Sequence, residues 1–290
     1  MVSLVEFFDA QSDMFQKITS FIDNNALCAF SLSCKAARNA VLSVQMILKT
    51  TYKSVVIQSI PLFMWAISMG ADTKKLDVAA SYYSTDINLL NYLLEEGYHL
   101  NSICNANARS GNIEVLKWAH KNEFYCDEKT CAFAAESGHF EILEWLHKIG
   151  CPWDRRTTWV AARNGHLSLL EWILENGCVY DNGVCARAAF GGHLNVVQWI
   201  REKGYGWDRF TCAFAASGGQ LEVLKWAHEN GCPWDEETCV GAANGGYFEL
   251  LKWAHENGCP WDERTCRFAA NNGHVDMLLW CINNGCPWNF

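Results

Sequence analysis

The sequence predicts an all-α fold in which short helical hairpins stack one after another along the chain. The first observation is an aromatic residue that recurs at a nearly constant step of 27 residues, at Trp65, Tyr92, Trp118, Trp145, Trp172, Trp199, Trp226, Trp253 and Trp280. The second is that an Ala-Ala pair and a glycine recur with the same period. A fixed period of this length marks a stack of similar small units. Each unit contacts only its neighbours, so the stack forms a long surface rather than a closed cavity.

The first helix of a unit is clearest in residues 235–261. Asp235 is a good N-cap because its carboxylate can accept hydrogen bonds from the free N–H groups of the first turn. Cys239, Ala242 and Ala243 share one face of the helix. Their small side chains let another helix lie close. The capping aspartate recurs at Asp127, Asp154, Asp181, Asp208 and Asp262, and the alanine pair at residues 79–80, 134–135, 161–162, 188–189, 215–216 and 269–270.

The second helix of the unit follows a glycine pair at residues 245–246, which breaks the first helix. Phe248, Leu251 and Trp253 form its apolar stripe. Gly258 ends it, because glycine adopts the left-handed C-cap conformation without strain. The same glycine follows the recurring aromatic residue at Gly70, Gly97, Gly150, Gly177, Gly204, Gly231 and Gly285, and Glu123 takes its place in one copy.

The core of each unit resembles the ankyrin repeat. The pattern Ala-Ala-x-x-Gly-His-Leu-Glu-Val-Leu-Lys-Trp is carried at residues 134–145, 161–172, 188–199 and 269–280. Ankyrin units are about 33 residues long and begin with Thr-Pro-Leu-His, whereas these units are shorter and have Thr-Cys without Leu-His. They are similar to the trimmed variant of large DNA viruses and some protists. The resemblance implies an ankyrin-like helical-hairpin solenoid that binds proteins through its first-helix face, with the turns braced by His139, His166, His193 and His274.

The segment before the array, residues 1–45, resembles an F-box. It carries Ile-x-Ser-Phe-Ile-Asp, then Ala-Leu, then Ser-Leu-x-Cys-Lys-x-x-Arg, without the usual Leu-Pro-x-Glu opening. The resemblance implies a short helical cap that docks on the adaptor subunit of a cullin ligase through Ile18, Phe21, Ile22, Leu27, Phe30, Leu32, Cys34 and Arg38. The alternative is that these helices only cap the first repeat, and both roles can hold at once. We assign residues 46–60 to a linker or degenerate first helix, and residues 61–290 to about nine ankyrin-like repeats.

Composition limits the classes of partner. The net charge is −9, and binding to phosphates requires clustered Lys and Arg, so we expect no nucleic acid partner. No stretch reaches the length of about 18 apolar residues that a membrane span needs, so we expect no membrane association. The first residues lack the basic region of a secretory signal. We therefore expect a monomer in the cytoplasm, that of the host cell if the source is viral, or in the nucleus.

The 15 cysteines recur in two registers, one in the first helix and one in the loop after the second helix. Equivalent positions in successive units lie about 8–10 Å apart, whereas a disulfide needs Cα atoms within about 7 Å. We therefore expect free, buried thiols in a reducing compartment.

A histidine precedes the loop cysteine in the pairs His147/Cys151, His228/Cys232 and His255/Cys259. Zinc needs four ligands, and other units break this pattern, so we predict no metal and no cofactor. We expect these histidines to interact with the carbonyls at the ends of their helices. Because histidine and cysteine recur from unit to unit, we assign both to the scaffold and predict no enzyme. We expect the tryptophans of the Cys-Pro-Trp connectors to pack over the neighbouring loop, the alternative being an exposed aromatic stripe.

Recognition is expected where the units differ, on the face of the first helices. Trp and Arg dominate the energetics of protein interfaces, so we predict partner contacts at Trp159, Arg163, Arg187, Phe190 and Arg267. The predicted function is a protein-interaction adaptor that acts as the substrate receptor of an SCF-type cullin ubiquitin ligase. The alternative is a stand-alone repeat protein that sequesters its partner.

Overall fold

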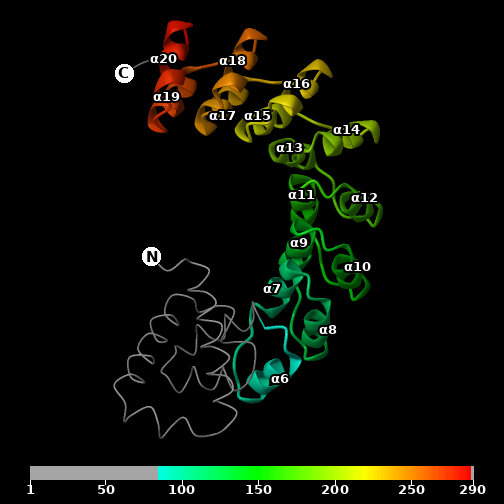
Figure 1. Cartoon of the computed structure of the whole chain (residues 1–290). Helices are drawn as coiled ribbons and strands as arrows, with labels where there is room; N and C mark the ends of the chain where they lie inside the picture. The colour runs from blue at the N-terminus through cyan, green and yellow to red at the C-terminus, as the bar shows by residue number, and fades with distance from the viewer. Residues whose placement is uncertain (1–83, 289–290) are drawn as a thin grey trace, which may run out of the picture. The chain divides into compact units, whose positions relative to one another are not determined.

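The computed structural model of the chain describes residues 84–288. Every regular element within them is a helix, as the ribbon in Figure 1 shows. The helices are α6 (Ile87–Glu95), α7 (Ile103–Ser110), α8 (Ile113–Lys121), α9 (Glu128–Glu136), α10 (Phe140–Lys148), α11 (Arg155–Arg163), α12 (Leu167–Glu175), α13 (Asn182–Gly191), α14 (Leu194–Glu202), α15 (Arg209–Ser217), α16 (Leu221–Glu229), α17 (Glu236–Gly245), α18 (Phe248–Glu256), α19 (Glu263–Asn271) and α20 (Val275–Asn283). The predicted all-α fold of successive helical hairpins is confirmed for these residues. The F-box-like segment and the linker lie outside them and stay predictions.

The chain divides into two compact units. The described part of the first unit holds α6, α8 and the beginning of α7, in residues 84–107 and 114–124. In this unit the indole N–H of Trp118 on α8 donates to the side-chain oxygen of Asn91 on α6, at 2.8 Å. The recurring aromatic residue therefore connects two helices as well as filling space between them.

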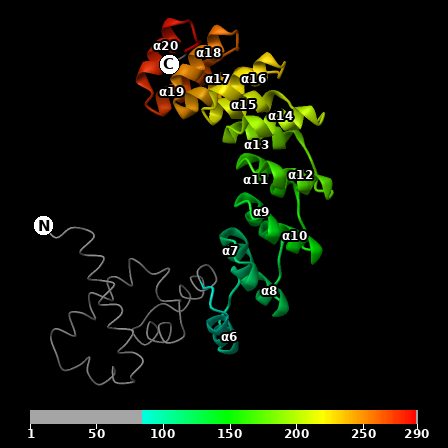
Figure 2. The same ribbon diagram turned by 45° about the vertical axis from the view of Figure 1, so that its right-hand side comes forward.

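The second unit comprises residues 108–113 and 125–290, and within it α9 to α20 form successive hairpins. The first helices α9, α11, α13, α15, α17 and α19 pack against one another in order. Figures 1 and 2 show these helices along the inner side of a curved row, with α10, α12, α14, α16, α18 and α20 along its outer side. The alanine pairs allow this close packing, and the pairs at residues 134–135, 161–162, 188–189, 215–216 and 242–243 have no exposed surface.

The helix ends follow the predicted capping pattern, with one exception among the N-terminal aspartates and one among the C-terminal glycines. The side chain of the capping aspartate accepts a backbone N–H of the first turn at Asp127, Asp154, Asp208, Asp235 and Asp262. The prediction for Asp181 is wrong, because its side chain makes no capping hydrogen bond. At the C-terminal ends, Glu123 has a φ of 63° and is the one non-glycine residue with positive φ in residues 84–288. It keeps the left-handed conformation of the glycines in the other units, with the steric strain of a side chain.

The loop cysteines connect the two ends of a hairpin. Their thiols donate to the backbone carbonyl of the aspartate that begins the same unit, at 3.4–3.5 Å, in Cys151, Cys178, Cys232, Cys259 and Cys286. The Sγ atoms of Cys131 and Cys151 also lie 3.5 Å apart. All cysteines in residues 84–288 are buried free thiols. Burial raises the pKa of Cys178 to about 11 and that of Cys185 to about 12, so these thiols remain protonated at neutral pH.

At four of the turns a histidine reaches across to the preceding unit, namely His139, His166, His193 and His274. His139 Nε2 lies 3.1 Å from the backbone oxygen of Arg109, and His166 makes the equivalent contact at 3.2 Å. The histidine ring also covers the turn glycine of the preceding unit. A Cβ atom on Gly165, whose φ is +75°, would lie 2.4 Å from Nδ1 of His193. The bracing contact implied by the ankyrin resemblance therefore stabilises the junction between units.

The connector tryptophans Trp153, Trp234 and Trp261 are half-buried and pack against the outer helices, as expected. The ring of Trp153 stacks on His147 with centroids 4.3 Å apart, and its edge meets Trp172 at 5.8 Å. The same pair of contacts recurs around Trp234 and Trp261. The structure thus corrects the expected role of these histidines: their rings stack on the connector tryptophan that follows in the chain.

Candidate protein-binding surface

Four of the five predicted partner-binding residues lie on two neighbouring helices. Trp159 and Arg163 belong to α11, and Arg187 and Phe190 belong to α13. Arg267 belongs to α19, with α15 and α17 between it and α13. Arg163 and Arg267 are exposed, and the other three side chains are half-buried. The structure therefore gathers four of these residues and leaves Arg267 apart.

Stacked arginine and aromatic side chains form a continuous network across α11, α13 and α15. The network, called the arginine–aromatic surface below, consists of Arg155, Trp159, Arg163, Arg187, Phe190 and Phe214. The guanidinium carbon of Arg187 lies 5.3 Å from the ring centre of Trp159 and 5.1 Å from that of Phe214. Arg155 lies 5.1 Å from the ring centre of Trp159. Each such contact contributes about 0.5–1 kcal/mol at an exposed site.

The other half of the network connects α11 to α13 through Phe190. The guanidinium carbon of Arg163 lies 4.8 Å from the ring centre of Phe190. Phe190 in turn meets Phe214 edge-on, with centroids 6.3 Å apart. Stacking uses the flat face of a guanidinium, whereas its N–H donors lie in the plane of the group. The arginines are therefore held in place with donors geometrically available to a ligand.

Trp159 is held in position by two residues of the following unit, Asp181 and Gly183. Its indole N–H donates to Oδ1 of Asp181 at 2.7 Å, which explains why Asp181 does not cap α13. A Cβ atom on Gly183 would lie 3.0 Å from Nε1 of Trp159. The units that begin at Asp127, Asp154, Asp208, Asp235 and Asp262 have Lys, Arg, Phe or Glu at the place of Gly183. The missing side chain therefore gives the indole its position.

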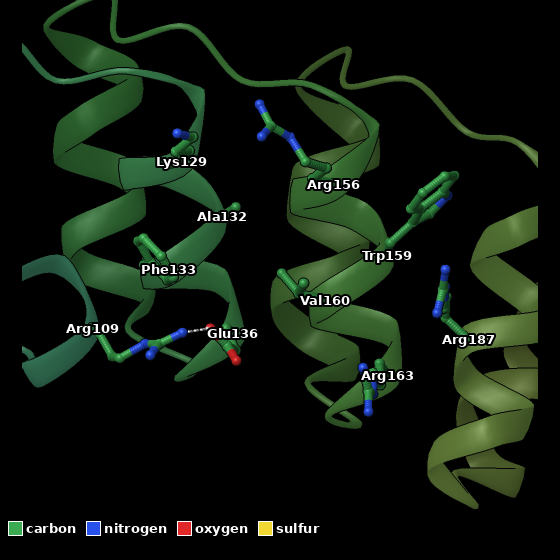
Figure 3. Close-up of a pocket in the computed structure, with 10 residues that line it drawn as sticks. All are labelled: Arg109, Lys129, Ala132, Phe133, Glu136, Arg156, Trp159, Val160, Arg163 and Arg187. Carbon is green, nitrogen blue, oxygen red and sulfur yellow. Dashed lines mark hydrogen bonds and ion pairs between the residues drawn. The ribbon is translucent and has the colours of Figure 1, made fainter. Parts of the chain in front are cut away.

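A groove of about 470 Å³ opens along α9, α11 and α13. Figure 3 shows Trp159 pointing from α11 toward α13, from which Arg187 extends. Phe133 and Val160, both half-buried, give the groove an apolar lining, and Lys129 adds a cation from α9. We did not predict Phe133, Lys129, Arg155 or Phe214 as contact residues. The one-unit separation between Arg187 and Phe214 is a signal that could have indicated Phe214.

Some cations around the groove form ion pairs with carboxylates, and others do not. Arg109 pairs with Glu136 at 2.5 Å, and Arg156 pairs with Asp154 at 2.9 Å. In the described part of the chain, four further cations form no ion pair with a carboxylate: Lys129, Arg155, Arg163 and Arg187. The surface thus concentrates unpaired positive charge in a chain whose net charge is −9.

The same residues, 84–288, contain no group of three or more His, Cys, Asp or Glu side chains arranged to hold a metal ion. None of the helices in this range combines the length and apolar character needed to cross a bilayer. The geometry described above is that of an open surface of charged and aromatic side chains, which suits binding of another macromolecule.

Comparison with known proteins does not assign a family. No family model matches the chain, and no curated protein matches it. Among solved structures it is similar to the human ASB11 ankyrin repeat domain, with a TM-score of 0.43 and 14% sequence identity over 54% of this chain and 84% of that chain. The repeat architecture is established by the helices and contacts of this chain.

Proposed function

We propose that this chain is a protein-interaction adaptor that binds its partner at the arginine–aromatic surface and the adjoining groove. One observation carries the proposal: Trp159 and Gly183 depart from the repeat, and the recurring aspartate of this unit, Asp181, holds the indole instead of capping α13. The units that begin at Asp127, Asp208, Asp235 and Asp262 keep the cap and have Ala, Val or Arg at the place of Trp159. The scaffold therefore forms without these changes, whereas Trp and Arg are the residues that dominate interfaces.

The chemistry of the repeated side chains supports a role without catalysis. A nucleophilic cysteine needs a lowered pKa and an accessible site. Burial raises the pKa of Cys185 to about 12. The hydrogen bond with Cys212 lowers the pKa of Cys232, but Cys232 is buried, like the other cysteines of residues 84–288. The repeated histidines stack on tryptophan or cover a turn glycine. In the described residues, these potentially reactive groups are therefore engaged in packing.

The proposal is tested by comparing proteins captured by the tagged full-length chain and by two charge-reversal variants, Arg187→Glu and Arg267→Glu. Both residues are arginines on first helices, and each lies near an aromatic ring. Circular dichroism establishes that both variants are folded. We expect Arg187→Glu to deplete a specific partner at least about tenfold, the scale of a lost hot-spot residue, and Arg267→Glu to retain it. If the amount of captured partner is unchanged by Arg187→Glu, or falls only with Arg267→Glu, the result would contradict the assigned surface.

We further propose that the partner is held for ubiquitination. This proposal is supported by the F-box-like pattern of residues 1–45, which include Phe21 and Leu32. An F-box-like segment bound to the adaptor subunit of a cullin ligase would bring the partner on the repeats close to the ligase. The mechanism is an increase in effective concentration, which requires no catalytic group on this chain.

The ligase role has its own test. Full-length protein is mixed with the purified cullin-ligase adaptor subunit, beside the variants Phe21→Asp and Leu32→Asp. We expect co-purification of the wild type and its loss in both variants, while the helical content of the repeats is unchanged. Absence of adaptor binding by the wild type would leave the sequestering alternative, in which the chain masks its partner. The monomeric state and the cytoplasmic or nuclear location stay predictions.

A further inference from the structure

We propose that the groove binds an extended acidic peptide segment of a partner protein. The carboxylates of this segment are spaced so that each of the successive first helices contacts one carboxylate. This inference rests on the proposed function, because it names the chemistry of the partner that the arginine–aromatic surface binds. It is argued from the charges, their placement on the helices and the apolar lining between them.

The arginines of the surface form no ion pair within the described residues. The guanidiniums of Arg155 and Arg187 both lie within 5.3 Å of the ring centre of Trp159, and neither forms an ion pair there. The carboxylate of Asp181 accepts the N–H of the same indole, so two cations lie beside one carboxylate that is already hydrogen-bonded. A ligand carboxylate that reaches either guanidinium gains charge-assisted hydrogen bonds.

The unpaired cations are distributed over neighbouring helices rather than gathered at one point. Lys129 comes from α9, Arg155 and Arg163 from α11, and Arg187 from α13. Packed helices lie about 8–10 Å apart. A polyproline II segment has three residues per turn and advances about 3.1 Å per residue, so that side chains on one face recur every 9 Å or so. Carboxylates at every third position therefore match the spacing of the helices.

This distribution favours several carboxylates over a single phosphate. A phosphate group draws three or so donors to one point, whereas the guanidiniums here are held apart by stacking on the rings of Trp159, Phe190 and Phe214. A fixed guanidinium edge can still donate two parallel hydrogen bonds to one carboxylate. Between the cations, Phe133 and Val160 line the groove. The bound segment therefore carries apolar side chains between its acidic residues.

Fluorescence anisotropy of labelled peptides on the full-length protein tests the inference. The main probe is a peptide of about twelve residues with glutamate at every third position and leucine between them, following the spacing above. Its controls have glutamine in place of glutamate, the same glutamates in one contiguous block, or a single phosphoserine. We expect the spaced glutamate peptide to bind at least about tenfold more tightly than each control, a factor equal to about 1.4 kcal/mol, and to weaken as salt rises. Equal or tighter binding of the phosphoserine or contiguous peptide would overturn the inference.

The site is tested with the same probe on protein variants. Arg187→Glu should weaken binding of the spaced peptide at least about tenfold, as expected for loss of a fixed charge pair, and the matched Arg267→Glu should leave it unchanged. Equal weakening by both variants would indicate nonspecific attraction and overturn the inference. If no acidic peptide binds while capture of a partner still depends on Arg187, the inference fails and the proposed function stands. If partner capture is also indifferent to Arg187, both fail.

Discussion

The junction between repeat units can be tested by replacing Gly165 with alanine and comparing it with the same change at Gly150. Both glycines have similar positive φ angles, +75° and +77°. A Cβ atom on Gly150 meets nothing within 4 Å, whereas one on Gly165 would lie 2.4 Å from Nδ1 of His193. Gly150→Ala therefore adds only the left-handed strain of about 1–2 kcal/mol. Gly165→Ala adds that strain and must also displace His193, at about 1–3 kcal/mol more.

The assay is urea unfolding followed by circular dichroism, with midpoints compared because a repeat array need not unfold in one step. We expect Gly165→Ala to lower the stability more than Gly150→Ala. We also expect His193→Ala to remove most of that difference, with a coupling of about 1–2 kcal/mol between positions 165 and 193. Equal losses for the two alanine variants, or strictly additive effects of Gly165→Ala and His193→Ala, would refute the reasoning that the ring braces successive units.

Three further predictions concern helix ends and buried thiols. Glu123→Gly should raise the stability by about 1 kcal/mol, because glycine relieves the strain at a φ of 63°, and a lower thermal midpoint would show otherwise. Asp208→Ala should lower the stability by about 1 kcal/mol through loss of a helix cap. Asp181→Ala should lower the stability by less but weaken partner binding, because it frees Trp159. An equal loss of stability in the two variants would be inconsistent with the missing capping bond of Asp181. Stability should fall as pH rises above about 9, because the pKa of Cys185 is raised from 9.0 to about 12 in the folded chain and the unfolded chain then releases this proton first. Urea midpoints that stay constant between about pH 8 and 10.5 would contradict this last prediction.

The hairpins were predictable because their signals are local. An aspartate at a helix start and a glycine at its end act on backbone groups within the same turn, so a period of 27 residues was enough to place them. The capping prediction failed at Asp181 because the competing partner, the indole of Trp159, belongs to the preceding unit. A capping pattern contains no information about a donor from another helix.

The candidate surface was predicted in part for a related reason. Variation between units indicated Trp159 and Arg187, since side chains that differ on a constant scaffold are free to serve recognition. Their stacking, and the participation of Phe214 and Lys129, depends on which turns of neighbouring helices face each other. That register follows from packing of the buried alanines and is visible only when the helices are placed side by side.

The central claim is that a partner binds on the first helices, over the arginine–aromatic surface. Hydrogen–deuterium exchange of the full-length chain with and without its captured partner tests it most directly. We predict slower exchange upon binding in α11 (Arg155–Arg163) and α13 (Asn182–Gly191), with little change in α12 (Leu167–Glu175) and α14 (Leu194–Glu202). Protection confined to α12 and α14, on the outer side of the row, would contradict the claim.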